Sequence, residues 1–161
     1  MTKLPENPEL LKLYRNGMSD KEIAEQFGCT VQAVNLRFVA MGLRQYRQKV
    51  TAILESAWPT SETRRGEFVR FNRYRDLTCF LRWRLGDNEL TANQIRGAKR
   101  FDRAIREGNC VLDFRPDSDE PWTFEPRHES DGRMVIRWPE GRPLPEGALR
   151  VALDLPRVPE I

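Results

Sequence analysis

Basic side chains, the groups that bind phosphate in proteins, are concentrated in the middle of this 161-residue chain. Residues 44–106 hold fifteen Lys/Arg and seven Asp/Glu, a net charge of +8, whereas residues 1–43 are neutral and residues 107–161 carry −5. Because the arginine fork grips phosphate or guanine through paired hydrogen bonds, this distribution predicts a phosphate-binding surface. A merely solvated arginine-rich face is the alternative. The candidate contacts are Arg44, Arg47, Arg64, Arg65, Arg70, Arg73, Arg75, Arg82, Arg96, Lys99, Arg100 and Arg103.

A second set of side chains, near residue 35, has the chemistry needed to recognise base pairs. Gln and Asn can pair in bidentate fashion with adenine and Arg with guanine, while small apolar groups can touch a thymine methyl. The predicted base-contacting residues are Thr30, Gln32, Ala33, Asn35, Leu36 and Arg37. Upstream, Ser19 and Lys21 are predicted to contact phosphate.

Other residue types offer weaker evidence for chemistry. Four carboxylates that could hold a catalytic metal ion surround a proline-containing turn: Asp113, Asp117, Asp119 and Glu120. They have no helical or histidine partner, so we interpret them as turn and edge residues, with a metal-dependent phage nuclease as the alternative. The single histidine, His128, and three widely spaced cysteines fit neither a catalytic set nor a metal or disulfide framework. We therefore expect no enzymatic activity, no metal and no cofactor.

The base-contacting set must be presented by a helix, and the sequence from residue 19 to residue 42 predicts one. Ser19 with Glu22 forms a capping box that opens a first helix, and Thr30 can cap a second. Between them, Gly28 can supply the left-handed conformation of a tight turn, while Ala24 allows the helices to cross closely. With a helix near residues 8–16, this pattern predicts a helix-turn-helix domain. A three-helix bundle that only packs or binds another protein is the alternative.

The core of this domain is predicted from apolar residues at helical spacing. That spacing also places the base-contacting residues on the outward side of the second helix. The predicted core residues are Leu10, Leu11, Tyr14, Ile23, Phe27, Val31, Val34, Phe38 and Met41.

The basic middle of the chain is also predicted to be helical. Residues 44–56 have helical composition, and Trp58-Pro59 ends that helix because a residue before proline avoids helical geometry. One or two helices are expected over residues 62–85, with an aromatic buried face and an arginine-rich exposed face. A capping box at Thr91 and Gln94 opens a further helix that is expected to stop at Gly108, with Arg96 to Arg103 opposite its apolar side. Some arginines are expected to pair with Glu67, Asp76, Asp87 or Asp102.

Beyond residue 108 the pattern changes to short alternating or apolar runs between turn residues, which predicts a small antiparallel sheet. Its expected strands are Cys110 to Phe114, Trp122 to Glu125, Met134 to Trp138 and Leu149 to Leu153, followed by a partly ordered proline-rich tail. The predicted fold is mostly α with a small C-terminal antiparallel β-sheet. Its domains are a helix-turn-helix domain at 1–43, a helical linker at 44–59 and an α+β DNA-binding domain at 60–161.

In its order of motifs, the chain resembles the immunity repressors of temperate mycobacteriophages, which follow a helix-turn-helix with a second DNA-binding domain. The shared features lie between residues 19 and 137. They are Glu22 to Val34, Trp58-Pro59, the set Phe71, Arg73, Arg75 and Asp76, Leu112 to Phe114 with Pro116, Phe124 with Pro126-Arg127, and Val135 to Arg137. The Arg82 to Gly86 segment and the long tail depart from the pattern.

The resemblance implies a transcriptional repressor that binds short asymmetric operators as a monomer, maintains lysogeny and gives immunity to superinfection. An excisionase or other recombination accessory protein is the alternative within DNA binding. The expected partner is double-stranded DNA, with no membrane and no evident small-molecule ligand. With no apolar run near the 18 to 20 residues of a membrane span and no signal peptide, we expect the chain in the host bacterial cytoplasm, associated with the nucleoid.

Overall fold

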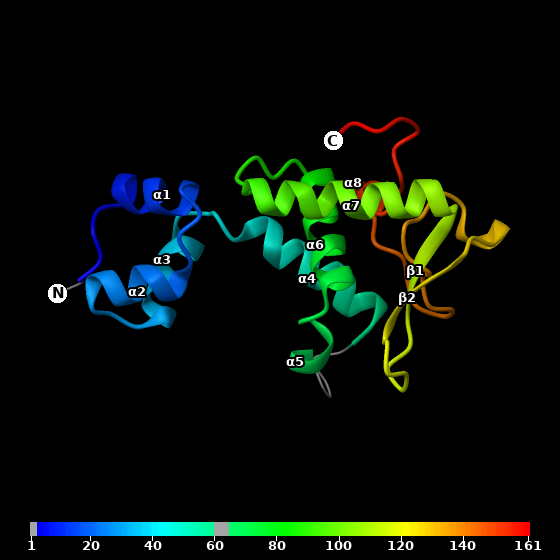
Figure 1. Ribbon diagram of the computed structural model, residues 1–161, viewed down its shortest axis with the longest axis horizontal. Helices are drawn as coiled ribbons and strands as arrows, with labels where there is room; N and C mark the ends of the chain where they lie inside the picture. The colour runs from blue at the N-terminus through cyan, green and yellow to red at the C-terminus, as the bar shows by residue number, and fades with distance from the viewer. Residues whose placement is uncertain (1–2, 60–64) are drawn as a thin grey trace. The chain divides into compact units, whose positions relative to one another are not determined.

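The computed structural model describes residues 3–59 and 65–161. Within these ranges the chain forms eight α-helices and a two-stranded antiparallel sheet, which confirms the predicted fold class (Figure 1). It divides into two compact units, Met1–Tyr46 and Arg47–Ile161, each with its own hydrophobic core. No helix in the described part of the chain combines the length and the apolar character that a membrane crossing requires.

The first unit contains helices α1 (Asn7–Arg15), α2 (Asp20–Phe27) and α3 (Val31–Ala40). Both predicted caps are formed: the Ser19 hydroxyl accepts the Glu22 N–H at 3.2 Å, and the Glu22 carboxylate accepts the Ser19 N–H at 2.7 Å. The Thr30 hydroxyl accepts the Ala33 N–H at 3.1 Å and so opens α3. Between the helices, Gly28 has a φ of 62°, in the left-handed region that the turn was predicted to need.

The core of the first unit follows the predicted spacing with two exceptions. Val31 is 45% exposed because it is the first residue of α3, one turn before the buried Val34. Leu11 lies outside the cluster, whereas Leu4, which was not predicted, is buried in it. The buried residues are Leu4, Leu10, Tyr14, Ile23, Ala24, Val34 and Phe38.

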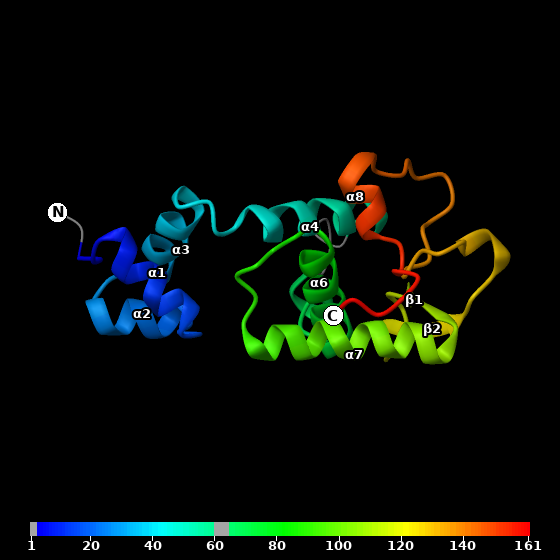
Figure 2. The same cartoon turned by 90° about the horizontal axis from the view of Figure 1, so that it is seen from above.

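The second unit is built around three helices, α4 (Gln45–Ala57), α6 (Asn72–Arg84) and α7 (Ala92–Gly108), with the short α5 (Arg65–Phe68) before α6. Helix α7 lies across α6 in both views (Figures 1 and 2). Four residues of α4 are buried in this unit's core: Val50, Ile53, Leu54 and Ala57. The helix that the sequence suggested as a linker is therefore part of the second unit.

Helix α7 begins with the predicted capping box of Thr91 and Gln94 and ends one residue later than expected. Gly108 is still helical, and Asn109, with a φ of 44°, provides the left-handed cap. Asparagine tolerates this conformation better than most residues other than glycine, which explains why the glycine was not required to end the helix.

Two of the predicted strands form the sheet, β1 (Cys110–Phe114) and β2 (Trp122–Pro126), with Leu112 opposite Phe124. The third predicted strand is only an extended segment, joined to β1 by a parallel bridge between Leu112 and Ile136. The fourth prediction is wrong, because helix α8 (Gly147–Ala152) covers most of residues 149–153. An i,i+4 ion pair of 2.8 Å between Arg150 and Asp154 supports that helical turn.

Candidate nucleic-acid interface

The exposed face of α3 carries part of the predicted base-contacting set. Gln32 and Asn35 are exposed, and Leu36 is 67% exposed, although a leucine normally gains by burial. Thr30 is also exposed, but its hydroxyl already caps the helix. The first two turns of α3 therefore present two amide side chains and one apolar side chain to the surroundings.

Two members of the predicted outward set lie differently. Ala33 is half-buried and packs against the first unit's core. Arg37 is half-buried as well, because its Nη1 donates hydrogen bonds of 3.1 Å to the Pro5 carbonyl and to Asn7 Oδ1. Arg37 thus ties α3 to the segment before α1. The members of the set that the structure places in the exposed class are Thr30, Gln32, Asn35 and Leu36.

At the start of α2, Ser19 and Lys21 are both exposed. The pKa of Glu22 lies below its ordinary value. The larger cause is the hydrogen bond from the Ser19 backbone N–H to the Glu22 carboxylate, and the smaller is the interaction with the Ser19 hydroxyl. The helix start is therefore held in a fixed conformation. The exposed Lys21 is the basic residue of this first turn, which also holds the carboxylates Asp20 and Glu22.

Arg44 has a structural role inside the first unit, which the sequence did not suggest. Its side chain is buried, its Nη2 donates to Asp20 Oδ1 at 2.7 Å, and its guanidinium lies 5.9 Å and 5.2 Å from the ring centroids of Tyr14 and Phe38. These contacts link the end of the first unit to the start of α2. They account for a charged side chain at this position without any contact to phosphate.

In the second unit, Arg82 is also buried rather than on the expected exposed face. It is 4% exposed, and its Nε donates to Asp87 Oδ2 at 2.8 Å, with Asp87 itself 5% exposed. The pairing with Asp87 was among those expected from the sequence. Separating the two groups would leave a buried charge without a partner, which is strongly unfavourable. The Asp87 carboxylate therefore fixes the position of the Arg82 side chain.

Helix α7 presents the predicted basic stripe. The four members Arg96, Lys99, Arg100 and Arg103 are exposed, while Ala98, Phe101 and Ile105 on the other side are buried. Arg100 forms two hydrogen bonds to Asp76 of α6, at 3.0 Å and 2.9 Å, yet its side chain stays 61% exposed. The hydrogen bonds and charge of Asp76 raise the pKa of Arg100 above its ordinary value.

Gly97 explains how Asp76 reaches α7, a role that the sequence patterns did not predict. A Cβ at this position would lie 2.7 Å from Asp76 Oδ1, so any other residue would require the carboxylate to shift from its present position. The available signal was a glycine inside a helical pattern, where it costs about 1 kcal/mol relative to alanine and usually has a packing reason.

The arginines around α6 have varied surroundings. Arg70 is exposed beside the Phe71 ring, and Arg73 donates to the Trp122 carbonyl at 2.8 Å while its guanidinium lies 4.8 Å from the centroid of Phe124. Arg75 is exposed and Arg47 half-buried. Of the remaining candidates, Arg64 and the side chain of Arg65 lie outside the described residues.

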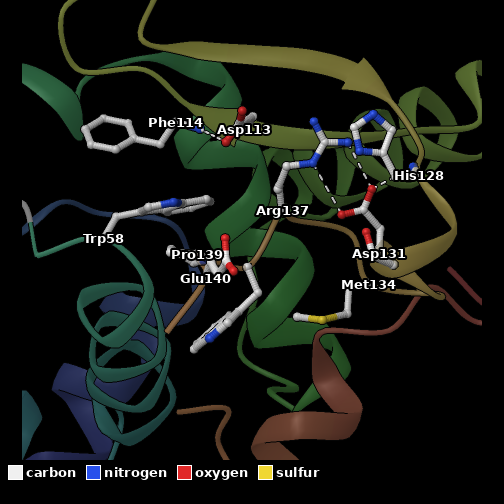
Figure 3. A pocket seen from close by; sticks show the side chains of 11 residues that line it. Trp58, Asp113, Phe114, His128, Asp131, Met134, Arg137, Pro139 and Glu140 are labelled. Carbon is white, nitrogen blue, oxygen red and sulfur yellow. Dashed lines mark hydrogen bonds and ion pairs between the residues drawn. The ribbon is translucent and has the colours of Figure 1, made fainter. Parts of the chain in front are cut away.

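The carboxylates considered for metal-dependent catalysis do not act as a group. Asp117, Asp119 and Glu120 are exposed in the β1–β2 turn, whereas Asp113 lines a pocket of about 600 Å³. Figure 3 shows that pocket, with Arg137 hydrogen-bonded to Asp131 near His128 and with Trp58 close to Phe114. In residues 3–59 and 65–161, no three His, Cys, Asp or Glu side chains are grouped so that they could hold a metal ion.

Comparison with known proteins adds no assignment: no protein-family model and no curated protein matches this chain.

Proposed function

We propose that this protein is a sequence-specific double-stranded DNA-binding transcriptional repressor. The observation that carries the proposal is the helix pair α2–α3, which is capped at both starts, turned at Gly28 and packed on its own core. It leaves Gln32, Asn35 and Leu36 exposed on the first two turns of α3. In a helix-turn-helix this is the part that enters the major groove, where amide side chains pair with adenine and an apolar side chain can meet a thymine methyl.

In this proposal the second unit supplies backbone affinity. The exposed stripe on α7 offers four positively charged side chains, of which Arg100 is paired with Asp76, and each phosphate contact that such charges make releases counterions from DNA. Two linked DNA-binding units raise each other's effective concentration, so an asymmetric site needs no partner chain. Occupying an operator in this way would block RNA polymerase, as in the phage immunity repressors that the chain resembles.

The test begins by selecting binding sites for the full chain from random duplex DNA. The selected site is then titrated with the wild type and with Gln32→Ala and Asn35→Ala. Each substitution should cost about 1–3 kcal/mol in affinity for the selected site, while affinity for unrelated DNA stays nearly constant. Gln26→Ala is a matched control, because Gln26 is an exposed amide on α2. If both α3 variants bind the selected site as the wild type does, the proposed readout by α3 is wrong.

A reporter gene placed downstream of the selected site distinguishes repression from the other DNA-related functions. Repression that is lost with Asn35→Ala supports the proposal. Site-specific binding without repression, together with stimulation of a recombinase, would instead indicate a recombination accessory protein. Plasmid cleavage that requires Mg²⁺ would indicate the nuclease.

A further inference from the structure

A pocket of about 470 Å³ in the second unit has an unusually basic lining. Its walls come from α4, α6 and α7 and include three arginines, Arg47, Arg75 and Arg82. None of the described side chains that line it is a carboxylate. The pocket of Figure 3 differs in this respect, since Asp113, Asp131 and Glu140 all line it. The composition of the α4–α6–α7 pocket therefore favours an anion.

Arg82 gives the pocket a buried and incompletely satisfied guanidinium. Its Nε is used by Asp87, whereas its Nη2 is sealed from solvent and has no hydrogen-bond partner among the described residues. A buried donor without a partner costs about 1–3 kcal/mol, and more when the group is charged. An acceptor that entered the pocket could remove part of this cost after a small shift of the side chain. Arg82 is thus a fixed positive charge at the wall of the pocket.

Arg47 and Arg75 add two charges that the described part of the chain does not neutralise. Neither guanidinium forms an ion pair or hydrogen bond with a described residue. Both side chains are at least partly exposed, so they can turn toward a ligand at the mouth. Of the carboxylates nearby, Asp87 is paired with Arg82 and Asp76 with Arg100, so an anion in this pocket would meet the uncompensated guanidinium groups of Arg47 and Arg75.

The polar residue from α7 also acts as a donor. Gln94 Oε1 accepts the Thr91 N–H at 2.9 Å as part of the capping box, which leaves its amide nitrogen as the atom able to donate. Thr51 contributes a hydroxyl from α4. Guanidinium forks, an amide N–H and a hydroxyl together match the oxygens of a tetrahedral anion.

We infer that the α4–α6–α7 pocket binds a phosphoryl group. Its volume exceeds that of a single phosphate and lies within the range of small-molecule sites, so part of a nucleotide can follow the phosphate. The phosphoryl group belongs either to the DNA backbone, in which case the inference rests on the proposed function, or to a free phosphorylated molecule. The two sources share the same contacts and are separated by experiment.

The test uses the full chain and pyrophosphate as the probe. Isothermal titration should give saturable binding to the wild type that is weakened about tenfold or more in Arg47→Gln and Arg75→Gln, since each removes a charge-assisted contact. Arg142→Gln, which removes an exposed arginine outside the pocket lining, is the matched control. Both pocket positions are accessible to solvent, so these variants should fold, which circular dichroism checks.

A second measurement identifies the source of the phosphoryl group. For each protein, DNA affinity is measured over a range of salt concentrations. A salt slope that falls by about 1 in Arg75→Gln, together with the loss of pyrophosphate binding, identifies a DNA phosphate. Lost pyrophosphate binding with an unchanged slope identifies a free phosphorylated molecule. If the wild type binds no pyrophosphate, or if the pocket variants bind it as the control does, the inference is wrong. If the chain binds pyrophosphate in this pocket but binds no DNA, the proposed function is wrong and the inferred phosphoryl site is supported.

Discussion

Arg82 and Asp87 form a buried ion pair, and the stability of the second unit depends on keeping both charges. Removing one charge of such a pair leaves the other uncompensated in a medium that solvates it poorly. We expect Asp87→Asn to lower the free energy of unfolding of the second unit by about 3–5 kcal/mol, as followed by urea denaturation. Asp87 also accepts the Glu89 N–H at 3.0 Å, a bond that the one carbonyl oxygen of Asn can retain, so the effect reports the lost charge together with the lost hydrogen bond from Arg82 Nε.

A matched substitution uses a more exposed pair. Asp154→Asn breaks the ion pair with Arg150, in which each side chain is one-third exposed, and should cost less than about 1 kcal/mol. Equal losses for the two substitutions would show that burial does not strengthen the Arg82–Asp87 pair.

Asp131 makes stability depend on pH in a defined direction. Burial alone would raise its pKa, but the Arg137 guanidinium and the His128 N–H hydrogen-bond to the carboxylate and lower the pKa below its usual value. A lowered pKa contributes stability above the pKa of the unfolded chain, and this stability is lost as the pH falls through the folded value. We therefore expect Asp131→Asn to be destabilising at pH 7 and progressively less so below about pH 4. Urea midpoints of the wild type and of Asp131→Asn across this pH range measure the difference in stability. A difference that does not shrink on acidification would contradict the predicted role of Asp131.

Among the structural elements, the α2–α3 turn depends most on one residue type. Gly28 has a φ of 62° and open space where a Cβ would lie, so alanine there is disfavoured by its backbone conformation and not by a clash. We expect Gly28→Ala to destabilise the first unit by about 1–2 kcal/mol, and Gly28→Asn to cost less. Thermal unfolding monitored by circular dichroism checks this order.

Gly66→Ala is the control for this substitution. Gly66 lies in α5, where its φ is ordinary and an added Cβ would meet nothing within 4 Å. Alanine there should be neutral or slightly stabilising, because it restricts the unfolded chain. If Gly28→Ala were equally neutral, the turn would not depend on the left-handed conformation.

The elements also show where sequence patterns fail. The caps at Ser19, Thr30 and Thr91 were predictable because each cap involves residues three positions apart, whose chemistry is local. The helix α8 was missed because its six residues are too few to distinguish a helical from an extended apolar pattern. The segment from Met134 to Trp138 looked like a strand but makes only two isolated bridges, Ile136 with Leu112 and Met134 with Asp154, since its pairing depends on which neighbours the fold provides.

At the scale of the whole molecule, the two hydrophobic cores have no residue in common, and α4 belongs to the second. We expect a fragment of residues 47–161 to fold by itself and to unfold cooperatively in urea. A fragment of residues 60–161 should not fold, because it lacks five buried side chains, Val50, Ile53, Leu54, Ala57 and Trp58, each leaving a cavity that costs about 1–5 kcal/mol. Circular dichroism and urea titration of both fragments provide the measurement. If the 60–161 fragment is stable, α4 is a linker and not a required part of the second unit's core.

Local sequence was enough to place the helix starts, the Gly28 turn, the apolar side of each long helix and the basic character of the middle region. These follow from interactions between residues near in the chain or from composition. Which charged side chains are available to a ligand depended instead on the three-dimensional fold. Arg37 and Arg44 carry the same guanidinium as Arg96 and Arg103, yet they hydrogen-bond to partners 32 and 24 residues away. Whether an arginine can meet a ligand depends on which acceptors the fold brings within about 3 Å, and that distance is not encoded in residue type or spacing.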